Sequence, residues 1–134
     1  MHSIKIVSII DDEQDITILF RDAIMGINGV TVLTFTDPRL ALEHFQMNKH
    51  TYVLVISDFR MPELNGMELF RKMKESNKFV RTILMTAFAL DDKIFKEYVR
   101  REIIDAFLQK PIHLNDLRDE VNAQLHAYQL GKKK

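Results

Sequence analysis

Three aspartates stand at the ends of two apolar segments, and carboxylates in that position can hold a metal ion. Asp11 and Asp12 follow segment 4–10, and Asp58 follows segment 52–57. Short segments rich in β-branched residues are typical of strands that are buried on both faces of a parallel sheet. Ligands of an open α/β sheet bind just beyond the carboxyl ends of its strands. If the two strands are neighbours, the three carboxylates meet in one pocket.

Carboxylates gathered in one pocket repel each other. Two like charges about 4 Å apart cost roughly 4 kcal/mol at an effective dielectric constant of about 20. A hard divalent cation removes this cost, because it prefers oxygen ligands that carry charge. The sequence therefore predicts a Mg²⁺ site, and ligands that are all oxygens also permit Mn²⁺.

Strand-like and helix-like segments alternate along the rest of the sequence. Further strands are predicted at 30–35, 81–86 and 105–108, and Pro111 stops the last one. Apolar residues at helical spacing predict five helices between and after the strands. Their stripes are Ile16, Leu19, Phe20, Ala23 and Ile24; Ala41, Leu42 and Phe45 after the N-cap pair Asp37-Pro38; Leu64, Met67, Phe70 and Met73; Ile94, Tyr98 and Val99; and Leu114, Leu117, Val121, Leu125 and Tyr128. Such alternation favours parallel strands joined by right-handed crossovers, which gives an α/β sandwich of three layers.

Composition narrows the class of protein. A chain of 134 residues fits one domain that folds without disulfides or structural metals. The sequence has no cysteine, and its five histidines lack the spacing of metal ligands. Basic and acidic residues number 19 each, so no net charge steers the protein to nucleic acid or to an anionic membrane. The sequence contains neither a membrane-spanning segment nor a signal peptide. We therefore expect a cytoplasmic protein that binds neither nucleic acid nor membranes.

Two further polar residues follow predicted strands, and with them the sequence resembles a known family. Thr86 ends segment 81–86, and Lys110 follows segment 105–108. The chain resembles the receiver domain of two-component response regulators, on motifs that each stand at a strand end: Ile9-Ile10-Asp11-Asp12-Glu13, Ser57-Asp58-Phe59-Arg60-Met61-Pro62-Glu63-Leu64-Asn65-Gly66, Met85-Thr86-Ala87 and Phe107-Leu108-Gln109-Lys110-Pro111. The resemblance implies a flavodoxin-like (βα)₅ fold with strand order 2-1-3-4-5. It also implies a receiver domain over residues 1–129, followed by a disordered tail or the start of a linker over 130–134.

The resemblance implies a role for each site residue. Asp58 matches the family's phosphoacceptor, whose carboxylate attacks phosphorus to form an aspartyl-phosphate. Asp12, Asp58 and the backbone carbonyl of Arg60 would ligate Mg²⁺, and Asp11 would act mostly through a metal-bound water. Lys110 would pair with a phosphoryl oxygen as a compact charge.

Other implied roles concern the switch. The hydroxyl of Thr86 would move inward to another phosphoryl oxygen, and Phe107 matches the aromatic ring that turns inward with it. The Lys110–Pro111 peptide bond is expected to be cis, which an X–Pro bond permits at low cost. Arg60 and Phe88 occupy variable positions that modulate the lifetime of the phosphoryl group in relatives, and we predict that Phe88 shields the site from water. The segment 101–105 departs from the family pattern, because it lacks the glycine common before the last strand.

Each residue taken alone has a simpler interpretation that stays open at this point. Asp11 or Asp12 could cap the first helix, and Asp58 could form an Asx-turn before Met61-Pro62. Thr86 could be an ordinary strand residue, Lys110 a solvated lysine and Phe107 a core residue. The functional interpretation depends on all of them meeting at one sheet edge.

The family resemblance implies a signalling protein that catalyses only its own phosphorylation and dephosphorylation. Its partners would be a sensor histidine kinase and an unidentified downstream protein or output domain, with a phosphorylation-dependent homodimer as one possible output. Its partner-binding face would consist of the fourth helix, last strand and last helix. Two alternatives are a Mg²⁺-dependent phosphohydrolase with an aspartyl nucleophile and an interaction module of the same fold that is never phosphorylated. A nucleotide- or flavin-binding domain is disfavoured, because no glycine-rich loop follows the first strand.

Overall fold

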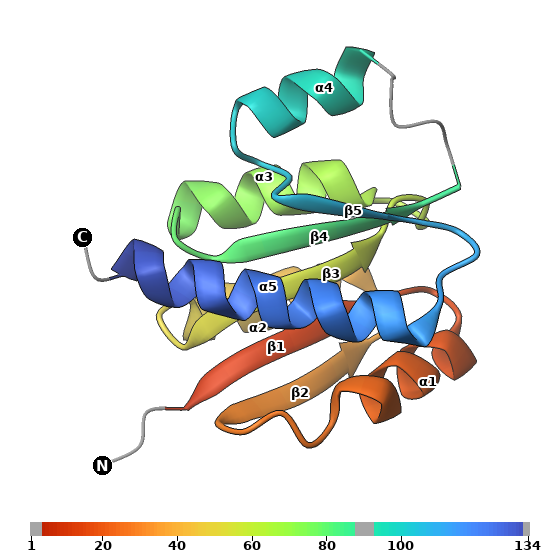
Figure 1. Cartoon of the computed structure of the whole chain (residues 1–134). Coiled ribbons are helices and arrows are strands. Elements are labelled where there is room, and N and C mark those ends of the chain that lie inside the picture. Colours follow the sequence, from red (N-terminus) through yellow and green to blue (C-terminus); the bar gives the residue numbers. More distant parts are fainter. Residues whose placement is uncertain (1–3, 88–92, 133–134) are drawn as a thin grey trace.

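A parallel sheet of five strands forms the centre of the molecule (Figure 1). The structure, a computed structural model, describes residues 4–87 and 93–132. The strand order is β2-β1-β3-β4-β5, and all neighbours pair in parallel. The strands are β1 (Lys5–Ile10), β2 (Val30–Phe35), β3 (Tyr52–Asp58), β4 (Arg81–Thr86) and β5 (Ala106–Gln109). The predicted α/β sandwich with flavodoxin-like strand order is therefore confirmed.

Helices cover both faces of this sheet. They are α1 (Gln14–Ile24), α2 (Pro38–Asn48), α3 (Gly66–Ser76), α4 (Lys93–Arg100) and α5 (Leu114–Lys132). One core cluster joins α1 and α5 to the sheet, and a second cluster joins α2, α3 and α4 to the opposite face. Figure 1 shows α4 on the β5 side of the sheet. Three layers result, with two cores separated by the strands.

The strands supply both cores, because successive side chains of a strand point to opposite faces. In β1, Val7 and Ile9 belong to the cluster of α1 and α5, whereas Ile6 and Ile10 belong to the other cluster. All seven residues of β3 are buried. Burial on both faces explains why these strands are continuous apolar segments rather than alternating ones.

Local signals explain where two helices begin. Asp37 Oδ1 accepts a hydrogen bond of 2.9 Å from the Arg39 N–H, and Pro38 occupies the first turn of α2, as predicted. Asn65 caps α3 in the same way by accepting the Glu68 N–H at 2.9 Å.

Some predicted details differ in the structure. The fifth strand is Ala106–Gln109, one residue later than predicted. Leu19, placed in the apolar stripe of α1, is 46% exposed. In α4 the predicted stripe is wrong for Ile94 and Val99, which are exposed, whereas Tyr98 packs against the core and Phe95 is the buried residue. The reason is that α4 packs through one narrow side, which periodicity over eight residues does not locate.

Two further regions bear on the sequence predictions: the C-terminal residues and the segment 101–105. Residues 130–132 continue helix α5, whereas the expected tail began at 130; residues 133–134 lie outside the described residues. In the segment without the family's glycine, Glu102 adopts a positive φ of 60°. This is the left-handed conformation that glycine usually supplies after a helix. The Ile103 N–H donates to the Tyr98 carbonyl at 2.9 Å, so the C-terminus of α4 is still closed by a hydrogen bond.

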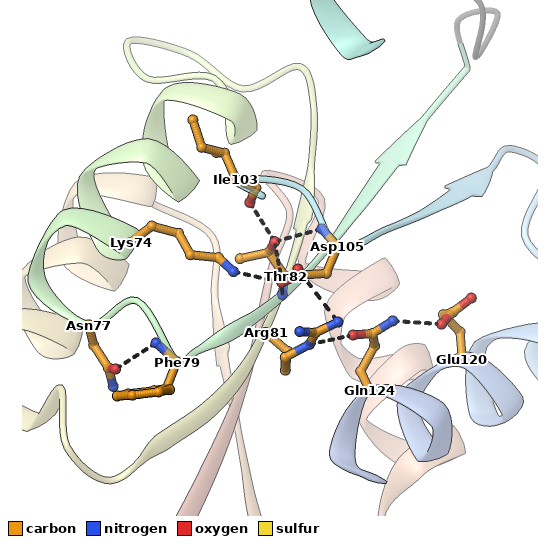
Figure 2. A network of polar contacts seen from close by, with 9 residues as sticks. All are labelled: Lys74, Asn77, Phe79, Arg81, Thr82, Ile103, Asp105, Glu120 and Gln124. Carbon is orange, nitrogen blue, oxygen red and sulfur yellow. Dashed lines mark hydrogen bonds and ion pairs between the residues drawn. The ribbon is translucent and has the colours of Figure 1, made fainter. Parts of the chain in front are cut away.

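A polar network lies at the amino-terminal ends of β4 and β5, which we call the amino edge of the sheet (Figure 2). The Asp105 carboxylate accepts from Lys74 Nζ at 2.8 Å and from the Thr82 N–H at 2.9 Å. Arg81 lies 3.5 Å from the other oxygen of Asp105 and donates to Gln124 of α5 at 2.8 Å. The network therefore connects α3, β4, the start of β5 and α5 at the edge opposite to the three aspartates.

Candidate functional site

The carboxyl ends of β1 and β3 bring the three aspartates together. Ile10 pairs with Ser57, so Asp11 and Asp12 after β1 lie beside Asp58 at the end of β3. One carboxylate oxygen of each aspartate lies within 4.8 Å of those of the other two. Asp11 and Asp58 are buried, whereas Asp12 is exposed. The predicted convergence of these acids is present, and it creates a candidate cation site of oxygen ligands.

Asp11 combines a local and a shared role. Its Oδ1 accepts a hydrogen bond of 2.9 Å from the Glu13 N–H, next to the start of α1. Burial raises the pKa of Asp11 to about 6 despite this hydrogen bond, and the neighbouring charge of Asp58 adds to the rise. The helix-start interpretation is thus partly right for Asp11, but the same side chain also faces the acidic cluster. Burial and neighbouring negative charge both disfavour the ionised form of a carboxylate, and here they outweigh the hydrogen bond.

Asp58 is paired with Lys110 across the end of the sheet. Lys110 Nζ lies 2.8 Å from Asp58 Oδ1, and the Phe59 N–H donates to the same oxygen at 3.1 Å. Lys110 follows β5, and its peptide bond to Pro111 is cis, as predicted. Burial acts to lower the pKa of Lys110, but the hydrogen bond and charge of Asp58 outweigh it and raise this pKa. The ammonium group therefore stays charged beside the acidic cluster.

An open cleft adjoins this ion pair. A cavity of about 340 Å³ is lined by Asp58, Phe59, Arg60, Thr86, Ala87 and Lys110. Thr86, the last residue of β4, is 1% exposed. A second cleft of about 460 Å³ shares Phe59 and Arg60 and reaches Asp12. Of the predicted site residues, Asp58, Arg60, Thr86 and Lys110 line the first cleft, and Asp12 and Arg60 line the second. Asp11 lines neither cleft but keeps its carboxylate within 4.8 Å of those of Asp12 and Asp58.

Phe107 lies beside this group rather than in it. Its side chain is partly buried against the core and its ring centroid is 5.5 Å from that of Phe95. Phe88, the other predicted modulating residue, lies outside the described residues. The roles assigned to Phe107 and Phe88 therefore remain predictions.

Sequence reasoning assigned no role to Gly66, although the structure gives it one. A Cβ atom at Gly66 would overlap the backbone carbonyl oxygen of Asp58 and would lie 2.8 Å from Leu84 Cδ1. The Gly66 N–H also donates to the Phe59 carbonyl at 2.9 Å, which closes the loop after Asp58. The signal that could have found it is a glycine at the first position of a helix, directly after the N-cap Asn65.

The arrangement combines an acidic cluster for a cation, an ammonium group and a buried hydroxyl around one carboxylate. Comparison with known proteins agrees with it. A family model described as response regulator receiver domain matches residues 7–122. The chain belongs to this family.

Relatives of this receiver domain include proteins of different length. It is 28% identical over 124 residues to the polar-differentiation response regulator DivK of Brucella anthropi, covering 90% of this chain and 96% of DivK. It is equally similar to the DNA-binding transcriptional regulator NtrC of Escherichia coli, covering 92% of this chain but 25% of NtrC. A solved response regulator receiver domain from Clostridium thermocellum is 28% identical with a TM-score of 0.80, covering 94% of this chain and 98% of that one. The same domain thus occurs both almost alone and as a part of longer proteins.

The receiver domain shows no transmembrane signal in its helices. Within residues 4–87 and 93–132, none of them combines the length and the apolar character that crossing a bilayer requires.

Proposed function

We propose that this receiver domain acts in the cytoplasm and accepts a phosphoryl group on Asp58 from the histidine of a sensor kinase. The observation that carries the proposal is the meeting of Asp11, Asp12 and Asp58 within 4.8 Å, with Lys110 Nζ 2.8 Å from Asp58. Simple capping or turn roles give no reason for these side chains to share one cleft. Membership of a two-component signalling family supports the same function.

A divalent cation fits the donor set of this cleft. Three carboxylates that all supply oxygen favour Mg²⁺, and permit Mn²⁺, over softer metals. Asp12, Asp58 and the backbone carbonyl of Arg60 would hold the ion, with Asp11 acting through a water molecule. When bound, the cation neutralises charge on the phosphoryl oxygens during in-line transfer.

The residues of the chain supply the rest of the chemistry. Asp58 Oδ1 already receives the Lys110 ammonium and the Phe59 N–H, so we assign the attack on phosphorus to Oδ2. The Oδ2–P bond forms while the P–N bond of the kinase phosphohistidine breaks, and its electron pair stays on the imidazole nitrogen. Lys110 and the Thr86 hydroxyl then bind phosphoryl oxygens, which anchors up to about two negative charges.

The output follows from this rearrangement. The new charge shifts a two-state equilibrium of the domain, and Thr86 and Phe107 turn inward. The face of α4, β5 and α5 then changes its affinity for a downstream protein, an output domain or a second copy of the chain. Domain residues 1–129 carry this function, whatever the last residues connect to.

The test is phosphoryl incorporation from acetyl phosphate with Mg²⁺, followed by mass spectrometry of the intact chain. Wild type gains one phosphoryl group with the acid lability of an acyl phosphate, and Asp58→Asn gains none. Asp37→Asn serves as the control, because Asp37 caps α2 away from the cleft and should leave labelling unchanged. Labelling of Asp58→Asn at the wild-type level would contradict the assignment. Steady release of phosphate from simple phosphate esters would favour the phosphohydrolase, and wild type that takes up no phosphoryl group would favour the interaction module.

A further inference from the structure

Helix α4 is attached to the rest of the receiver domain through few side chains. Its eight residues are all described, and Phe95 is the one that is buried, at 3% exposure. Ile94 and Val99 are 57% and 44% exposed. A second attachment is the hydroxyl of Tyr98, which donates to Glu68 Oε1 of α3 at 2.9 Å. The position of α4 therefore depends strongly on what Phe95 contacts.

Phe95 lies against two aromatic rings from different parts of the sheet. Its centroid is 5.4 Å from that of Phe59, at an interplanar angle of 87°, and 5.5 Å from that of Phe107, at 52°. Both distances lie in the range of favourable edge and tilted ring contacts. Phe59 follows the acceptor Asp58 at the end of β3, and Phe107 is a residue of β5. The three rings form a chain whose middle member, Phe95, belongs to α4.

The two outer rings belong to segments that both bind the same oxygen of Asp58. The Phe59 N–H donates to Asp58 Oδ1 at 3.1 Å and to the Met85 carbonyl at 2.8 Å. Lys110, three residues after Phe107, places its Nζ 2.8 Å from the same Oδ1. Any change in the charge of this carboxylate therefore acts on both segments at once.

We infer that Phe95 is a positioning residue that transmits the state of Asp58 to α4 through Phe59 and Phe107. The inference rests on the proposed function and deepens it. When Asp58 is phosphorylated, both donors to Oδ1 rearrange, and the two rings attached to their segments shift. Close-packed side chains switch between discrete arrangements rather than yielding gradually, so Phe95 moves with its neighbours. Helix α4 then turns about its second attachment, the contact of Tyr98 with Glu68.

The test measures the site and α4 separately in the same sample. Amide ¹H–¹⁵N shifts are recorded with and without Mg²⁺ and beryllofluoride, which together imitate the phosphoryl group. Shifts at 58–60 and 110 report occupancy of the site, and shifts at 93–100 report the response of α4. Wild type is expected to respond in both regions. In Phe95→Leu, which keeps an apolar side chain but removes the ring, the site response remains and the α4 response falls below half.

The matched control is Val99→Leu, an exposed residue of the same helix, which should respond like wild type in both regions. An undiminished α4 response in Phe95→Leu, with a normal response at the site, would overturn the inference and leave the proposed function intact. If the site of wild type itself fails to respond, the proposed function fails, and the transmission through Phe95 fails with it.

Carbon chemical shifts of residues 93–100 show whether α4 is still helical in the variant. If Phe95→Leu unfolds α4, the test is repeated with Phe59→Leu, which removes the contact between the Phe59 and Phe95 rings without changing α4. It is expected to reduce the α4 response in the same way, and a normal response would overturn the inference.

Discussion

Lysine–aspartate pairs stand at both edges of the sheet in this receiver domain. At the carboxyl edge Lys110 Nζ lies 2.8 Å from Asp58, and at the amino edge Lys74 Nζ lies 2.8 Å from Asp105. The side chains of the aspartates are similarly buried, at 9% and 8% exposure, but Lys110 is 38% exposed and Lys74 only 11%. The two ion pairs therefore have the same residue types and the same N–O distance but lie in different environments.

The surroundings of the two carboxylates differ in charge. Asp105 accepts the Thr82 N–H and lies near a second cation, Arg81, so its charge is amply compensated (Figure 2). Asp58 instead pairs with Lys110 alone and lies beside two further acids, Asp11 and Asp12. The same contrast appears in the lysines, because burial lowers the pKa of Lys74 while the acidic cluster raises that of Lys110.

The comparison suggests a division of roles, in which the Lys74–Asp105 pair supports the fold and the Lys110–Asp58 pair belongs to the proposed phosphoryl site. A buried pair whose partners are satisfied fixes elements relative to one another, and losing one partner leaves a charge without compensation. A pair in an open cleft with excess negative charge favours cation binding and contributes little to the free energy of unfolding. Four experiments test this distinction.

The largest effect is expected for Lys74→Met. Loss of this ammonium leaves Asp105 buried with weaker compensation, so the free energy of unfolding should fall by about 3 kcal/mol. Urea unfolding measures it, and Lys72→Met, an exposed lysine of the same helix, is the matched control. Phosphoryl uptake per folded molecule should stay normal. A change in unfolding free energy no larger than that of Lys72→Met would show that the amino-edge pair is not structural.

Mg²⁺ should stabilise the carboxyl edge alone. At a concentration about ten times its Kd, binding raises the free energy of unfolding of wild type by about 1.4 kcal/mol. Asp12→Asn should lose most of this gain, because it removes one proposed ligand, whereas Lys74→Met should keep it. Thermal unfolding with Mg²⁺ or with EDTA gives the comparison. Equal gains in wild type and Asp12→Asn would contradict the proposed cation site.

Asp58→Asn should raise stability slightly when no divalent cation is present. The substitution removes repulsion with Asp11 and Asp12 but also loses the Lys110 pair, so we expect a net gain of about 1 kcal/mol in unfolding free energy. Urea unfolding in EDTA measures it. A loss of 2 kcal/mol or more would mean that the Asp58 pair supports the fold as the Asp105 pair does.

The smallest effect is confined to acid pH. Because burial raises the pKa of folded Asp11 from its ordinary value of 3.8 to about 6, the folded state binds a proton more tightly than the unfolded state. Without divalent cations, this proton stabilises the folded state fully below about pH 3.8, and the stabilisation is lost as the pH rises through about 6. Asp11→Asn should flatten this part of the curve of stability against pH. An identical curve for the variant would rule Asp11 out as its origin.

Much of this fold could be predicted from the sequence, because the strands are short apolar segments followed by polar residues. The bounds of β2 and β4 agree with the prediction, and the acids after β1 and at the end of β3 meet as expected. Helix α4 was the weakest prediction, because Phe95 and Ile94 are equally apolar and only the neighbouring rings decide which one is buried. The ion pair of Lys74 with Asp105 was also missed, since its partners lie 31 residues apart in the sequence.

The sequence by itself determined the alternation of strands and helices, and hence the edge at which Asp11, Asp12, Asp58, Thr86 and Lys110 gather. Hydrophobic periodicity and strand ends are local properties, and parallel pairing turns them into one shared edge. Only the tertiary structure decided which lysine–aspartate pair is enclosed and which is open, and which ring anchors α4. Burial and compensating charge come from neighbours that the chain brings together across tens of residues, and no local pattern encodes them.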